Sequence, residues 1–88
     1  MRINNKPTWK QQLLINTMEE CGELTQACSK ILRFGFDPEK VDDLVTEAGD
    51  LLCLIDLMVE FGCLAQEALD NRIPIKRNKL KIYSDILR

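Results

Sequence analysis

Two pairs of carboxylates, each pair three residues apart, are the clearest candidates for chemistry in this chain of 88 residues. They are Glu20 with Glu23, and Glu47 with Asp50. On an α-helix, residues three apart share a face with Cβ atoms about 5–6 Å apart, so both carboxylates of a pair can reach one cation. Hard cations such as Mg²⁺ and Mn²⁺ prefer such oxygen ligands. If two helices pack antiparallel, the spacing predicts four carboxylates around one metal site.

The alternative is that these acids are solvent-facing charges, which are common on exposed helices. Two observations favour a site. Both pairs lie within apolar stripes, where neighbouring carboxylates repel one another unless a cation compensates them. Each pair also encloses a glycine, Gly22 or Gly49, at a cost to a helix interior of about 0.8–1.0 kcal/mol relative to alanine. The glycines predict close approach of a backbone or ligand, or tight packing between helices.

The composition excludes several other kinds of site. The chain has no histidine, which excludes histidine-dependent triads and histidine zinc sites. Its net charge of −2 is unlike that of a basic nucleic-acid-binding domain, so we expect no nucleic-acid partner. The most apolar stretch, 51–59, is interrupted by Asp56 and is too short to cross a bilayer, so we expect no membrane partner.

The four cysteines bear on the compartment. None forms a CxxC motif. Three of them, Cys21, Cys28 and Cys53, fall within amphipathic helical patterns, and the fourth, Cys63, follows the second of these helices. Because the number of cysteines is even, a framework of disulfide bonds is one interpretation. The helical context favours reduced thiols in the core of a cytoplasmic protein.

Two long helices are predicted to position the carboxylates. The first begins near Thr8, which forms a capping-box pattern with Gln11, and ends at Gly35. The second opens at residues 37–38, where aspartate suits the N-cap and proline the first helical position, and ends at Gly62.

A third segment, from about Ala65 to Tyr83, contains Pro74, which predicts a kink or break near residues 72–74. We expect one all-α domain over residues 1–88, with two long antiparallel helices and a broken third. From Leu51 onward the second helix is apolar on most sides, more than one short chain can cover. This predicts a helical bundle completed by oligomerisation, as a homodimer or homotetramer.

Together, residues 19–24 (EECGEL) and 47–52 (EAGDLL) resemble the EExxE…ExxD signature of the MazG-like nucleoside triphosphate pyrophosphohydrolases, an all-α superfamily. The resemblance covers roughly residues 8–62. It implies hydrolysis of a nucleotide between the α- and β-phosphates, which releases a nucleoside monophosphate and pyrophosphate. It also implies that the ligands of Mg²⁺, or alternatively Mn²⁺, are Glu20, Glu23, Glu47 and Asp50.

Other residues are candidates for the remaining parts of the reaction. A bound cation would neutralise phosphate oxygens and lower the pKa of a bound water, so that no histidine is needed. Glu19 could orient or deprotonate that water, or it could be a surface acid. Lys30 lies seven residues after Glu23, nearly on the same face, and is a candidate phosphate contact together with Arg33.

The candidate substrate-binding residues outside the two motifs could each have a purely structural role instead. Lys76 and Lys79 could close over the phosphates, or could be solvated lysines. Trp9 could stack on a base, or could pack at the start of the first helix. As a whole, the chain could instead be a non-catalytic helical interaction module with residues 51–59 as its interface. A helix-turn-helix regulator is disfavoured because its recognition helix should be basic.

Overall fold

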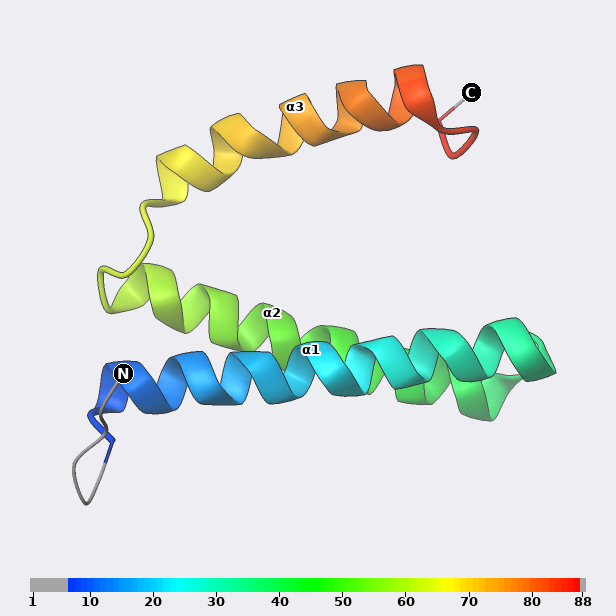
Figure 1. Cartoon of the computed structure of the whole chain (residues 1–88), viewed down its shortest axis with the longest axis horizontal. Coiled ribbons are helices and arrows are strands. Elements are labelled where there is room, and N and C mark those ends of the chain that lie inside the picture. Colours follow the sequence, from blue (N-terminus) through cyan, green and yellow to red (C-terminus); the bar gives the residue numbers. More distant parts are fainter. Residues whose placement is uncertain (1–6, 88) are drawn as a thin grey trace. The chain divides into compact units, whose positions relative to one another are not determined.

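The computed structural model describes residues 7–87, and over these it consists of three helices and the segments that join them, with no strand (Figure 1). The helices are α1 (Trp9–Phe34), α2 (Pro38–Glu60) and α3 (Gln66–Tyr83). The all-α prediction is confirmed. The chain divides into two compact units, Met1–Leu57 with α1 and most of α2, and Met58–Arg88 with the end of α2 and α3. That residues 1–88 make up one domain stays a prediction.

α1 begins where the sequence predicts because Thr8 caps it. The Gln11 backbone N–H donates to the Thr8 hydroxyl at 3.2 Å, and the Thr8 N–H donates to the Gln11 side-chain oxygen at 2.8 Å. This capping box satisfies N–H groups that a helix start otherwise leaves unpaired. At the other end, Gly35 has a φ of 97°, which glycine adopts at little cost, and its N–H donates to the Ile31 carbonyl at 2.8 Å.

The ends of α2 are also those that the sequence predicts. The backbone N–H of Lys40 donates to the Asp37 carboxylate at 2.9 Å, and the Lys40 ammonium pairs with the same carboxylate. The hydrogen bond from the Lys40 side chain is the main reason that the pKa of Asp37 lies below its ordinary value. After the last helical residue, Glu60, Gly62 adopts a φ of 79°.

α1 and α2 lie side by side and antiparallel (Figure 1). On each helix, one set of the less exposed residues recurs in alternating steps of four and three, and we call these two sets the contact stripes. On α1 the contact stripe is Leu13, Thr17, Glu20, Leu24, Ala27 and Ile31. On α2 it is Lys40, Leu44, Glu47, Leu51 and Leu54. The same periodicity that pairs the helices therefore places two of the predicted metal ligands between them.

Of the kink or break predicted for the third helix, the break is wrong, because α3 continues from Gln66 to Tyr83 with Pro74 inside it, and the kink stays a prediction. An interior proline removes one N–H donor and clashes with the carbonyl four residues earlier, which costs about 3 kcal/mol. A helix can absorb that cost by bending locally instead of ending. Many residues around Pro74 are good helix formers, which favours continuation.

The core of the described chain is small. Its buried hydrophobic side chains are Leu13, Ala27, Ile31 and Met58. The hairpin covers one side of each helix, and Leu52 on α2 is 61% exposed. Burial of α2 on several sides by further copies of the chain stays a prediction. None of the helices within residues 7–87 has the length and apolarity needed to span a bilayer.

Two expectations about small residues are also corrected. All four cysteines are free, but all four are exposed, so they are not core residues of the single chain. Cys21 and Cys28 each follow a contact-stripe residue by one position, which turns them out of the helix contact. A Cβ added at Gly22 or Gly49 would meet nothing within 4 Å. Within the described residues, no backbone or packed helix therefore approaches these glycines closely, and the approach of a ligand stays a prediction.

Candidate metal centre

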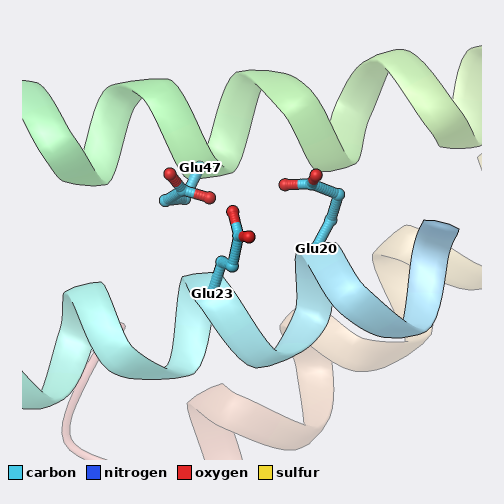
Figure 2. A group of neighbouring side chains, drawn as sticks. All are labelled: Glu20, Glu23 and Glu47. Atoms are coloured by element: carbon cyan, nitrogen blue, oxygen red, sulfur yellow. The ribbon is translucent and has the colours of Figure 1, made fainter.

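Three of the four predicted metal ligands come together between the two long helices. Figure 2 shows Glu20 and Glu23 on α1 directed toward α2, and Glu47 on α2 directed back toward them. One carboxylate oxygen from each lies within 4.8 Å of those from the other two. We call these residues the three-carboxylate cluster. Because hard cations bind oxygen at about 2.0–2.6 Å, one ion can bridge oxygens at this separation after small side-chain movements.

Asp50 lies outside this cluster but acts on it electrostatically. It is exposed on α2, three residues after Glu47. Its negative charge contributes to raising the pKa of both Glu20 and Glu47. Its role as a fourth ligand stays a prediction.

The cluster places carboxylate oxygens where they are buried without hydrogen-bond partners, which is energetically unfavourable. Glu20 and Glu47 are half-buried, and one oxygen of each, Oε2, is out of contact with solvent and lacks a hydrogen-bond partner. Burying such a group without a partner costs free energy, and more so when the group is charged. The unpartnered oxygens are therefore positions where a cation would stabilise the fold.

The pKa values reflect this crowding. The pKa of Glu47 is raised to about 7, first by a hydrogen bond with Glu23 that keeps the proton on Glu47. Burial follows as a cause, and then repulsion from Glu23, Glu20 and Asp50. The pKa of Glu20 is raised mainly by burial and then by repulsion from Glu23 and Asp50, while its hydrogen bond with Glu47 acts in the opposite direction. Near neutral pH, protons and metal ions would therefore compete for the carboxylates of the cluster.

The residues fit a hard divalent cation. The cluster supplies only oxygen donors, their charge is uncompensated, and two of the oxygens are buried without partners. No thiol belongs to the cluster, which disfavours soft metals. This chemistry suits Mg²⁺ or Mn²⁺ and agrees with the predicted donor set.

A cavity of about 300 Å³ adjoins the cluster and brings one predicted phosphate contact to it. Its lining consists of Glu23, Gln26, Ala27, Lys30, Asp43 and Glu47. Lys30 thus shares a cavity with two of the candidate metal ligands, as its spacing from Glu23 predicts. Such a cavity presents a cationic ammonium and a carboxylate metal site to the same small ligand.

Gln26 and Asp43 are cavity residues that the sequence analysis missed. A signal was present, because Asp43 precedes Glu47 by four residues and Gln26 follows Glu23 by three. Those spacings place each on the same helix side as its partner. Polar residues at such spacings are common on exposed helix faces, so the signal was weak.

Glu19 and Arg33, two other predicted site residues of the first unit, lie outside the cluster. Glu19 is exposed, and its charge is the smallest contribution to the raised pKa of Glu20. The guanidinium of Arg33 lies over the Phe34 ring, 5.2 Å from its centroid, and Arg33 does not line the cavity. Lys76 and Lys79 are exposed on α3 in the second unit.

Trp9 is the first residue of α1 and is 51% exposed. The Lys10 ammonium lies 5.4 Å from the centroid of its ring. Packing at the helix start and stacking on a base both stay predictions. The roles of Glu19, Arg33, Lys76 and Lys79 likewise stay predictions.

Comparison with protein-family models, with curated proteins and with solved structures finds no match for this chain. The resemblance to the MazG-like pyrophosphohydrolases therefore rests on the residues of its two motifs.

Proposed function

We propose that this chain is a Mg²⁺-dependent nucleotide pyrophosphohydrolase. It would cleave a ribo- or deoxyribonucleoside triphosphate between the α- and β-phosphates, giving the monophosphate and pyrophosphate. The observation that carries the proposal is the three-carboxylate cluster, formed from two helices and adjoining a cavity that Lys30 lines. The cluster and the lysine support metal-assisted phosphate chemistry. The choice of nucleotide and of the bond cleaved rests on the resemblance of the two motifs.

The residues of the cluster and the residues near it have distinct roles in this proposal. Glu20, Glu23 and Glu47 hold the cation, and Asp50 adds negative charge beside them. When bound, the cation would neutralise phosphate oxygens and lower the pKa of water. Lys30 supplies a positive charge to a phosphate in the same cavity. Glu19 orients the attacking water from its position next to Glu20.

The proposal also includes location and assembly. The four free cysteines support a reducing compartment, and we place the protein in the cytoplasm. The small number of buried hydrophobic side chains supports assembly with further copies, as a homodimer or homotetramer.

A second candidate function is a non-catalytic helical interaction module. It is favoured by the large apolar side chains that the described chain leaves exposed, among them Met18, Leu32 and Leu52. A module of this kind would not need the three-carboxylate cluster. The two functions therefore differ in their response to loss of a single carboxylate.

The test is turnover of nucleoside triphosphates by Glu47→Gln and Asp50→Asn, with Asp56→Asn as a matched control on the exposed side of α2. Both site variants are expected to lose turnover while circular dichroism shows that the helices are intact. The control is expected to keep the wild-type rate. Unchanged rates in both site variants would contradict the assignment of the site and favour the interaction module.

A further inference from the structure

Within the second unit, α3 and the segment after it border a hollow of about 540 Å³, which we call the basic hollow. Its lining consists of Pro74, Arg77, Asn78, Lys81 and Leu87. The first four follow one another at steps of three, one and three residues, so they share one face of α3. Leu87 comes from the segment beyond the helix, so the basic hollow has a wall besides the helix itself.

Hydrogen bonds direct the path of that segment. The Ser84 N–H donates to the Leu80 carbonyl at 3.0 Å, just after the last residue of α3. The Ile86 N–H donates to the Ser84 hydroxyl at 3.2 Å, which forms a local turn. Leu87 follows directly and is half-buried. The wall that Leu87 contributes is therefore positioned by the turn before it.

The three polar side chains of the basic hollow can all donate hydrogen bonds, and two of them are cationic. They present the guanidinium of Arg77, the amide of Asn78 and the ammonium of Lys81. Within residues 7–87, neither cation is paired with an acidic side chain, although like charges four residues apart on a helix repel each other. Residues 71–88 as a whole carry six basic side chains and one acidic side chain. A bound anion would relieve this repulsion and accept hydrogen bonds from the same groups.

We propose that the basic hollow binds a small phosphate anion, either free or as the terminal phosphate of a nucleotide. A guanidinium can hold two phosphate oxygens through parallel hydrogen bonds, and an ammonium adds a point charge. The volume falls within the range of about 300–1,000 Å³ that is typical of small-ligand sites. Because none of the lining residues is aromatic, the basic hollow suits the phosphate and offers no stacking surface to a base.

Charge favours a small anion over a nucleic acid. Residues 1–57 carry ten acidic and six basic side chains, and the whole chain has a net charge of −2. A long polyanion responds to the charge of the whole chain, which does not attract it. A small anion responds to nearby charges, because those beyond a Debye length of about 8 Å are screened at physiological ionic strength. The proposal is independent of the proposed catalytic activity, because no residue of the basic hollow belongs to the three-carboxylate cluster.

The first test is calorimetric titration of the full chain with inorganic pyrophosphate in EDTA, so that no metal ion at the three-carboxylate cluster contributes to binding. Arg77→Gln is compared with Arg72→Gln, because both arginines are exposed on α3 and only Arg77 lines the basic hollow. Arg77→Gln is expected to raise the dissociation constant about tenfold or more, the value of a charged hydrogen bond, and Arg72→Gln to leave it nearly unchanged. The same comparison with ADP distinguishes a free anion from a nucleotide-borne phosphate, and Arg77-dependent binding of either ligand supports the proposal.

The second test needs no variant. Pyrophosphate is titrated into isotopically labelled wild type, again in EDTA, and the signals are followed by NMR. The side-chain amide of Asn78 is expected to shift together with the backbone amide of Lys81, while the amide of Arg72 stays in place. The proposal is overturned if neither ligand binds at millimolar concentration, or if Arg77→Gln and Arg72→Gln weaken binding equally. Binding of a short oligothymidylate through Arg77 more tightly than pyrophosphate would also overturn it, in favour of a nucleic-acid site.

Discussion

Metal binding at the three-carboxylate cluster should release protons at neutral pH, because one of its ligands is partly protonated there. The pKa of Glu47 is about 7, and its proton is held by the hydrogen bond with Glu23 and by the surrounding negative charge. A cation needs the ionised carboxylate, so binding displaces this proton. To test this, the protein is titrated with Mg²⁺ or Mn²⁺ at several pH values.

The magnitude follows from the pKa. With a pKa of about 7, Glu47 is protonated in about nine-tenths of molecules at pH 6, half at pH 7 and one-tenth at pH 8. Binding should therefore release about 0.9, 0.5 and 0.1 proton per cation at these pH values. Below pH 7, the apparent affinity should fall by close to tenfold for each unit of pH.

Isothermal titration calorimetry can count these protons. The same titration is run in two buffers of different ionisation enthalpy, and the difference in heat gives the number of protons released. Glu47→Gln is expected to abolish the release that depends on pH around 7, and Asp56→Asn to preserve it. The reasoning would be refuted by cation binding with no proton release at pH 7, or by unchanged release in Glu47→Gln.

Further predictions concern stability and substrate binding. Without divalent cations, the pKa of Glu47 is higher in the folded chain than in the unfolded chain, where it is 4.5. The stability of the wild type should therefore fall relative to that of Glu47→Gln as the pH rises from 4.5 to about 7. Thermal melts of both proteins across this range test the prediction, and parallel curves would contradict it. Gly49→Ala should raise the free energy of unfolding by about 0.8–1.0 kcal/mol in urea titrations, because a methyl group there meets open space. Thr8→Ala should lower it by about 1 kcal/mol, because the capping box is lost. Lys30→Met should raise KM for the nucleotide about 10- to 100-fold, the value of a charged hydrogen bond, whereas equal effects of Lys30→Met and Arg33→Met would remove the special role of the cavity lysine.

The helix ends and the position of the cluster could be predicted because they depend on local rules. Thr8 caps α1 through residues three positions away, and Gly35 ends it by adopting a positive φ. Glu20 and Glu47 fall on the same periodicity as the apolar residues that join the helices. Once two amphipathic helices pair, carboxylates on those stripes have to face one another.

Predictions that depended on tertiary burial were less successful. Cys21 and Cys28 lie on an apolar stripe, but each helix has two such stripes and the sequence does not say which one the hairpin covers. The cost of Pro74 was known, but whether a helix bends or ends depends on how well its flanks propagate. Gln26 and Asp43 became visible as cavity residues only when α1 and α2 were placed together.

The proposed activity is tested most directly by identifying the products formed from a panel of ribo- and deoxyribonucleoside triphosphates. Wild-type protein and Glu47→Gln are incubated with Mg²⁺ or with EDTA, and the products are separated by chromatography. We expect nucleoside monophosphate and pyrophosphate from the wild type with Mg²⁺, and neither product in EDTA or from Glu47→Gln. Absence of turnover on every triphosphate, or turnover that persists in EDTA and in Glu47→Gln, would contradict a metal-dependent pyrophosphohydrolase at the three-carboxylate cluster.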